Sequence, residues 1–240
     1  MRTQYLLKAE LLKDKVSSFK EFPFHLPAVR YLDNLEFHPH VTFIVGENGS
    51  GKSTLLEAIA ISWGFNAEGG SKNFNFSTQS THSDLYKCLR LSKGTSHAKD
   101  GYFLRAESFY NVASEVKKLG VGDSYGDKAL HDQSHGESFM SLVLNRFSGN
   151  GLYILDEPEA ALSPSRQLAL ISRIHDLVSQ NSQFIIATHS PILMAYPDSC
   201  IFVLEESGIK NIDYTKTEHY QVTKEFINNY PKMLKILMAD

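Results

Sequence analysis

A glycine-rich segment in the first quarter of the chain has the spacing of a phosphate-binding loop. Gly46–Ser53 matches G-x-x-x-x-G-K-[ST] at every fixed position. Glycines in such a loop let backbone N–H groups curl around anionic oxygens, and the N-terminus of the following helix adds a favourable dipole. The Lys52 ammonium would then reach the β and γ phosphates of a nucleotide, and the Ser53 hydroxyl would hold Mg²⁺. We therefore expect nucleotide binding by Asn48, Gly49, Ser50, Gly51, Lys52 and Ser53.

A second chemical signal is a pair of acids that directly follows an apolar segment. Leu152–Leu155 is continuously apolar and leads into Asp156 and Glu157. An Asp at the carboxyl end of a core strand, near a phosphate loop, holds Mg²⁺ directly or through water. Glu157 points to a different side and would polarise an attacking water as general base. The alternative is a pair of solvated acids at a helix N-terminus, which the upstream phosphate loop disfavours.

The elements that must position these residues are indicated by the apolar pattern. Five segments are apolar almost without alternation, which is typical of strands buried on both faces of a parallel sheet. They are Val41–Val45, Tyr102–Leu104, Leu152–Leu155, Phe184–Ala187 and Ile201–Leu204. Helical patterns cover Lys52–Trp63 and Pro164–Ser179, and Ser163 is the candidate N-cap of the latter. This alternation predicts an α/β fold with a mostly parallel core sheet flanked by helices. Together with the loop at Gly46–Ser53 it indicates a P-loop NTPase.

The rest of the chain indicates peripheral features. Tyr5–Leu12 and Leu35–Phe37 have the pattern of short antiparallel strands, and residues 64–83 predict a long surface loop rich in Gly, Ser, Asn and Thr. Glu218–Leu237 predicts a helix that is broken or kinked at Pro231. We expect a single domain over 1–240, made of an antiparallel β lobe (1–40), a nucleotide-binding core (41–204) and a C-terminal strand and helix (205–240).

Composition excludes several classes of protein. The 240 residues include 24 Lys and Arg against 27 Asp and Glu, a net charge of −3, which excludes a polybasic nucleic-acid-binding protein and gives DNA contact no support. Cys88 and Cys200 lie far apart without a CxxC partner. Neither a disulfide framework nor a zinc knuckle is expected, and the setting is predicted to be reducing and cytoplasmic. No apolar stretch approaches the ~18–20 residues of a membrane helix, so we expect no membrane insertion.

Four segments fall in a distinctive order along the chain. They are Gly46–Thr54, Ser134–Glu137, Leu155–Pro158 and Ala187–Ser190. This set resembles the ATP-binding-cassette (ABC) ATPases, and the resemblance covers about residues 41–204. It implies an ABC ATPase head that binds ATP and Mg²⁺ and forms an ATP-dependent homodimer.

The resemblance also implies a role for individual residues. Those that would bind the phosphates or the metal are Lys52, Ser53, Thr54 and Asp156. Glu157 would be the catalytic base, and His189 would be the switch histidine that contacts the γ-phosphate and the attacking water. The signature residues Ser134, Gly136 and Glu137 would act in trans on the nucleotide of a second copy.

The chain departs from the family pattern at three places. Ser134–Glu137 reads Ser-His-Gly-Glu instead of Ser-Gly-Gly-Gln, which puts an acid in place of a neutral amide. Ala160–Ser163 replaces the Ser-Ala-Leu-Asp of many transporters. Arg105–Ser108 stands where the family has a glutamine, and Glu107 is the expected metal- or water-contacting substitute. These departures favour the soluble, non-transport branch, which includes RecF-like and SMC-like ATPases.

Three functions therefore remain as hypotheses. The first is an ATP-gated dimerisation switch that serves DNA repair or phage defence with a partner protein, such as an effector or a nuclease. The second is the nucleotide-binding subunit of an ABC transporter. The third is a nucleotide sensor that does not hydrolyse, which Glu157 argues against. The interval between Ser53 and Ser134 lacks heptads and is too short for coiled-coil arms, so a compact head without arms is predicted.

Overall fold

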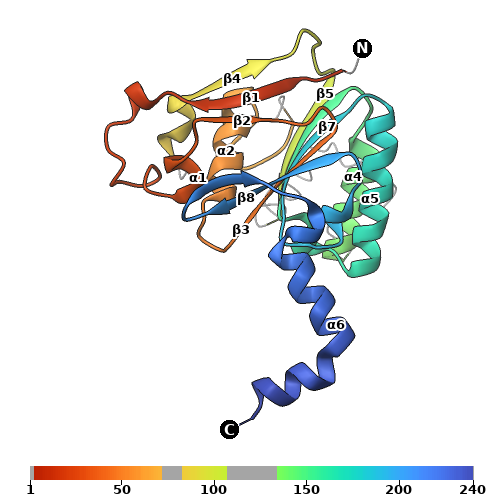
Figure 1. The fold of residues 1–240 in the computed structure, drawn as a ribbon. Coiled ribbons are helices and arrows are strands. Elements are labelled where there is room, and N and C mark those ends of the chain that lie inside the picture. The colour runs from red at the N-terminus through yellow and green to blue at the C-terminus, as the bar shows by residue number, and fades with distance from the viewer. Residues whose placement is uncertain (1–2, 72–82, 107–133, 240) are drawn as a thin grey trace.

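A six-stranded sheet runs through the centre of the molecule (Figure 1). The computed structural model describes residues 3–71, 83–106 and 134–239. The strand order is β5-β6-β7-β3-β8-β9, and the pairs are parallel except for β8 with β9. The strands are β3 (Val41–Gly46), β5 (Asp100–Arg105), β6 (Gly151–Asp156), β7 (Gln183–Ala187), β8 (Ser199–Glu205) and β9 (Gly208–Asn211). Each of the five continuous apolar segments forms one of these strands, which confirms the predicted α/β fold.

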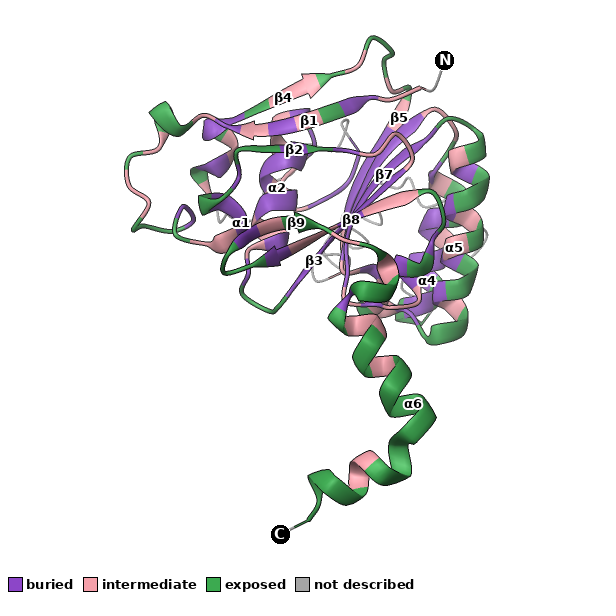
Figure 2. Cartoon of the chain, viewed as in Figure 1, coloured by how far each residue is buried: buried purple, intermediate pink, exposed green. Residues whose placement is uncertain are grey.

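The central strands are mostly apolar because helices cover both faces of the sheet. Every residue of β3, β6 and β7 is buried (Figure 2). One face packs against α2 (Lys52–Trp63), and the other packs against α4 (His135–Arg146) and α5 (Pro164–Ser179). Strands that are buried on both faces cannot alternate with polar residues, which explains the pattern seen in the sequence.

A second, three-stranded antiparallel sheet has the order β2-β1-β4. Its strands are β1 (Leu6–Leu11), β2 (Asn34–Glu36) and β4 (Leu89–Lys93). The first two confirm the antiparallel strands expected within residues 1–40. The third comes from a later part of the chain and was not expected, because its two leucines alternate with Arg90 and Ser92 over only five residues.

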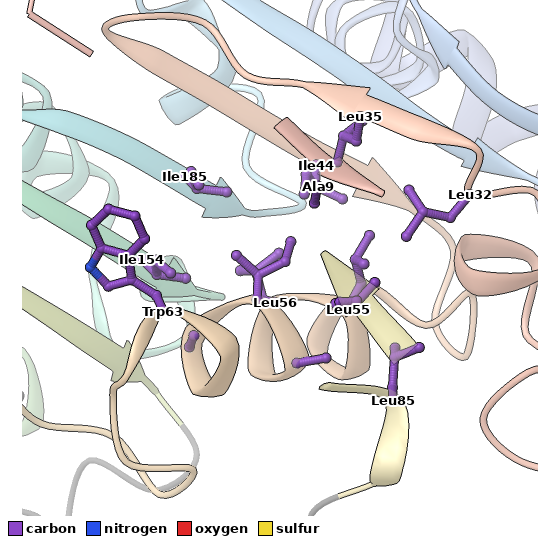
Figure 3. Close-up of a cluster of buried hydrophobic side chains, with 14 of the residues drawn as sticks. Ala9, Leu32, Leu35, Ile44, Leu55, Leu56, Trp63, Leu85, Ile154 and Ile185 are labelled. Carbon is purple, nitrogen blue, oxygen red and sulfur yellow. The ribbon is translucent and has the colours of Figure 1, made fainter. Parts of the chain in front are cut away.

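Helix α2 lies between the two sheets (Figure 3). Leu55 and Leu56 are buried completely, in a cluster that joins Ile44, Ile154 and Ile185 of the core sheet to the antiparallel sheet. The helix ends at Gly64, which adopts the left-handed conformation and donates its N–H to the carbonyls of the last turn. The phosphate-binding loop therefore leads into a helix that is enclosed on several sides.

The helices on the opposite face begin at polar caps. In α5, the side chain of Ser163 accepts the N–H of Arg166, and Pro164 occupies the first helical position, as the sequence predicted. Helix α4 begins at His135, because Ser134 serves as its N-cap. A short helix, α1 (Pro27–Arg30), lies beside the phosphate-binding loop. Single 3-10 turns occur at Lys13–Lys15, Asp84–Cys88, Pro158–Ala161, Leu193–Ala195 and Tyr214–Lys216.

The two sheets are joined by one buried amide side chain, that of Gln183 in β7. Its Oε1 accepts the backbone N–H groups of Tyr5 (3.0 Å) and Leu6 (2.9 Å). Its Nε2 donates to the carbonyls of Leu6 (2.8 Å) and His38 (3.0 Å). The amide thus extends the backbone hydrogen bonding of the core sheet to the first strand of the antiparallel sheet.

The last helix, α6 (Glu218–Leu237), leaves the body of the protein and points away from it (Figure 1). Its residues are exposed or half-buried along the whole length (Figure 2). The backbone of Asn229 is not helical (φ −131°, ψ 21°), so the kink predicted at Pro231 occurs two residues earlier. Among the residues that the structure describes, no helix is long and apolar enough to cross a membrane.

Candidate nucleotide-binding site

Three chain segments meet at the carboxyl-terminal edge of the core sheet. They follow β3, β6 and β7, and the last two strands are immediate neighbours of each other. The backbone N–H of Glu157 donates to the Ala187 carbonyl (3.0 Å), and that of Thr188 donates to the Ile44 carbonyl (3.2 Å). In an open α/β sheet this edge is where ligands bind. The motifs that are far apart in sequence therefore lie side by side.

The loop after β3 has a backbone that requires glycine. Gly49 and Gly51 have φ of 82° and 96°, in the left-handed region that disfavours other residues. A Cβ on Gly51 would also lie 3.1 Å from the Ala28 Cβ and 3.2 Å from the Leu26 Cβ. The loop is anchored to α1, because the Ala28 N–H donates to the Ser50 carbonyl. These features hold the loop around the side chain of the residue that follows it.

That residue, Lys52, places its ammonium inside the loop. The side chain is 4% exposed, and Nζ donates to the carbonyls of Gly46 (2.8 Å) and Glu47 (2.9 Å). Burial lowers the pKa of Lys52, whereas the charges of Glu157 and Asp156 raise it. A positive charge enclosed by glycine-rich backbone is the arrangement expected around nucleotide phosphates.

Ser53 and Asp156 place two side-chain oxygens next to each other at the same edge. The Ser53 hydroxyl donates to Asp156 Oδ1 over 3.1 Å. Burial raises the pKa of Asp156 to about 6, against the opposing effects of Arg105, Ser53 and Lys52. Hard oxygen ligands of this kind fit Mg²⁺, which takes one or two carboxylates together with phosphate oxygens and water. Consistent with so few protein ligands, the described residues hold no cluster of three or more His, Cys, Asp or Glu side chains suited to a metal.

Arg105 occupies the end of β5 and contacts this pair. Its Nε lies 3.6 Å from Asp156 Oδ2, and its Nη1 lies 2.8 Å from Glu57 Oε2 of α2. The sequence pointed instead to Glu107 in this region, which lies outside the described residues. Arg105 was missed because its role depends on the register of β5 and β6, which places it directly opposite Asp156.

Glu157 and His189 face each other beyond the pair formed by Ser53 and Asp156. Glu157 adopts a left-handed conformation (φ 50°, ψ 51°), which turns its side chain away from that of Asp156. The side chain is 41% exposed, and its Oε1 lies 3.7 Å from His189 Nε2. A left-handed conformation in a residue with a Cβ carries strain that is common at active sites. The geometry therefore leaves one carboxylate accessible to water and next to a histidine.

Two further residues hold His189 in place. Glu159 accepts the backbone N–H of His189, and burial raises the pKa of Glu159. His219, in the first turn of α6, lies 3.2 Å from His189, from Nε2 to Nδ1. The sequence signal for Glu159 was weak, because it is one more acid in an acidic turn. No sequence signal pointed to His219, because it lies thirty residues beyond His189.

The signature segment lies on the other face of the core sheet from α2. The carboxylate of Glu137 accepts the Ser134 N–H (2.9 Å) and hydroxyl (2.7 Å), and Arg166 Nη2 lies 3.3 Å from Glu137 Oε1. Ser134 and Glu137 are exposed, whereas Gly136 is buried and a Cβ there would lie 2.8 Å from the Ala161 carbonyl. The unexpected acid is thus a capping residue paired with an arginine of its own chain.

A cleft of about 1240 Å³ opens beside the loop. It is lined by Gly46–Ser50 and by Lys216–His219 together with the next turn of α6. Glu157 and His189 also line it. The first turns of α6 therefore border the same space as the phosphate-binding loop.

Comparison with known proteins agrees with this geometry. The family model described as "AAA domain" matches residues 18–146, and a model described as "AAA ATPase domain" matches residues 138–194. The chain belongs to the AAA domain family. Its fold and motifs are those of ABC-type P-loop ATPases.

Curated relatives of this AAA domain protein share about a quarter of their aligned residues with it. The L-arabinose transport ATP-binding protein AraG of Geobacillus stearothermophilus is 26% identical over 228 residues, which cover 84% of this chain and 43% of AraG. The ABC transporter G family member STR2 of Medicago truncatula is 25% identical over 171 residues, which cover 63% of this chain and 24% of STR2. The chain thus spans less than half the length of these relatives.

Among solved structures, cbiO1 from Clostridium perfringens, described as part of the ABC transporter complex cbiONQ, has the same fold. It superposes with a TM-score of 0.53 at 18% identity and covers 99% of this chain and 100% of its own. The fold expected from the sequence, a mostly parallel core sheet with an antiparallel sheet beside it, is therefore confirmed.

Proposed function

We propose that the chain binds ATP with Mg²⁺ and hydrolyses it, in a site that a second copy of the chain completes. The observation that supports this most directly is the grouping at one sheet edge of an enclosed ammonium, a pair of metal-binding oxygens and an accessible carboxylate. These are Lys52, Ser53 with Asp156, and Glu157. They are contributed by neighbouring segments whose backbones are hydrogen-bonded to one another.

Each group has a distinct task in this proposal. Lys52 and the loop N–H groups bind the phosphates and orient the γ-phosphate. Ser53 and Asp156 hold Mg²⁺, which neutralises phosphate charge when it is bound. Glu157 takes a proton from the attacking water, since its carboxylate is accessible and lies outside the metal-binding pair. His189 donates an N–H to the γ-phosphate and keeps its place beside Glu157.

The second copy supplies Ser134 in this proposal. Ser134 is exposed at the N-terminus of α4, a twelve-residue helix whose dipole favours an anion. The acid in the signature does not oppose anion binding, because Arg166 balances the charge of Glu137 and the carboxylate is turned back onto the Ser134 N–H. ATP bound between two copies would hold them together, and hydrolysis would release them.

For the biological role, we favour a dimerisation switch that acts on a partner protein in DNA repair or phage defence, in accord with the departures from the transporter motifs. A transporter subunit is the second candidate, because curated relatives such as AraG carry transport in their names. The two candidate functions differ in what would stimulate ATP hydrolysis. A cytosolic protein or DNA would stimulate hydrolysis by a dimerisation switch, whereas a membrane-embedded partner would stimulate hydrolysis by a transporter subunit.

The test of hydrolysis is Glu157→Gln. This variant should bind ATP, hydrolyse it at least 100-fold more slowly, and elute as a dimer in ATP and Mg²⁺. Lys52→Ala is the matched control, which should lose ATP binding and remain monomeric. Turnover at the wild-type rate by Glu157→Gln would show that another residue is the base, and a wild type that binds ATP without hydrolysing it would indicate a sensor.

Completion of the site by a second copy is tested by mixing two inactive variants. Ser134→Asp keeps an intact loop, and Lys52→Ala keeps an intact signature. A mixed dimer would contain one complete site, so activity should reappear on mixing. Two variants that stay inactive together, each folded as judged by circular dichroism, would contradict a shared site.

A further inference from the structure

The first turn of α6 is fixed against the segment that carries His189. Thr217 caps the helix, because its hydroxyl oxygen accepts the Tyr220 N–H (3.2 Å) while its O–H donates to the Tyr214 carbonyl (2.7 Å). Tyr214 in turn donates its hydroxyl to the Pro191 carbonyl, two residues beyond His189. These hydrogen bonds fix the position of His219 in this turn.

His219 and His189 are in ring-to-ring hydrogen-bond contact. His189 Nδ1 lies 3.2 Å from His219 Nε2, and the ring planes are inclined by 48° with centroids 5.4 Å apart. Two imidazole nitrogens share a hydrogen bond only if one carries a proton and the other does not. The contact therefore couples the tautomers of the two rings.

The other nitrogen of His189 decides the direction of this bond. His189 Nε2 faces Glu157 Oε1 at 3.7 Å, and an ionised carboxylate favours an N–H opposite it. With the proton on Nε2, the Nδ1 of His189 is an acceptor and His219 Nε2 must be the donor. Burial lowers the pKa of both rings, which favours their neutral forms. The charged or titratable groups that face the pair are Lys52, Glu157, Glu159 and Glu218.

We propose that His219 is a positioning residue that donates from Nε2 to His189 Nδ1 and so keeps the N–H of His189 on the side of Glu157 and the bound γ-phosphate. The phosphate in this statement rests on the proposed function. Without the donor, His189 would also populate the tautomer with its proton on Nδ1, which offers a lone pair to the phosphate and repels it. Helix α6 would thus contribute to catalysis through a residue that acts on His189.

The experiment compares His219→Leu with His219→Gln and measures both hydrolysis and the state of His189. His219→Leu should lower kcat for ATP about tenfold, the effect of one lost hydrogen bond, with KM changed less than twofold. His219→Gln should stay within about threefold of wild type, because its amide N–H donates from nearly the same position. His97→Leu, at an exposed histidine remote from the site, is the control and should match wild type.

Long-range ¹H–¹⁵N spectra of the His189 ring provide a readout that needs no hydrolysis. Wild type and His219→Gln should show a protonated Nε2, and His219→Leu should show a mixture with protonated Nδ1. A folded His219→Leu variant with wild-type kcat and an unchanged His189 tautomer would overturn the positioning role. If the wild type does not hydrolyse ATP, the proposed function fails by itself, and the nitrogen shifts of His189 still decide whether His219 sets its tautomer.

Discussion

Replacing Gln183 by an apolar residue of similar size should remove the hydrogen bonds that join the two sheets and so lower the free energy of unfolding. In Gln183→Met, the buried N–H groups of Tyr5 and Leu6 lose their acceptor, and the carbonyls of Leu6 and His38 lose a donor. The Leu6 carbonyl keeps a second partner, the Gln4 amide at 3.1 Å. At about 1–3 kcal/mol for each buried group left unsatisfied, we expect a loss of about 4 kcal/mol in the free energy of unfolding.

Urea denaturation followed by circular dichroism measures this loss. With an m value of about 3 kcal/mol per M, the midpoint should fall by roughly 1.3 M urea. Gln221→Met, at an exposed glutamine of α6, is the matched control and should change the free energy of unfolding by less than about 0.5 kcal/mol. A loss below about 1 kcal/mol in Gln183→Met would refute the reasoning, because the amide would then not be what joins the first strand to the core sheet.

Two further predictions concern the loop and a buried acid. Gly51→Ala should weaken ATP binding at least tenfold, as measured by calorimetry. Gly64→Ala is the control, because Gly64 also has a positive φ but lies at the far end of α2, and it should leave ATP affinity unchanged. Equal ATP affinities of the two variants would contradict the role of loop geometry. Burial by itself raises the pKa of Asp100. Hydrogen bonds from Tyr153, Ser148 and the Gly101 backbone, together with the charge of Arg146, outweigh burial and hold the pKa below its ordinary value of 3.8. The stability contributed by this carboxylate is therefore present above about pH 4 and lost as pH falls further. The urea midpoint of Asp100→Asn should accordingly fall less steeply below about pH 4 than that of wild type. The same pH dependence in both proteins would refute a stabilising role of the Asp100 carboxylate.

The fold was predictable from the sequence where burial leaves a simple pattern. Strands covered on both faces, such as Leu152–Leu155, are continuously apolar, and the helix at Pro164–Ser179 carries its own capping residues. Strand β4 was missed because a short strand with one face to solvent alternates with polar residues and resembles a loop. Local sequence therefore predicts the centre of the fold better than its periphery.

The candidate site was predictable only where its residues are contiguous. The loop at Gly46–Ser53 and the acids at Asp156 and Glu157 are read directly from the chain. Arg105 and His219 reach the site through strand register and helix packing, which no local pattern encodes. The spacing Ser-x-x-Glu at Ser134–Glu137 is that of a capping box. The capping role of Glu137 could therefore have been predicted from the sequence.

The kink at Asn229 divides α6 into two halves. The first half is tied to the body through Thr217 and His219, and the second half continues into open solvent. Because the backbone of Asn229 leaves the helical conformation, the helix changes direction between the two halves (Figure 1). The residues of α6 that line the cleft extend only as far as Thr223, so all of them precede this kink.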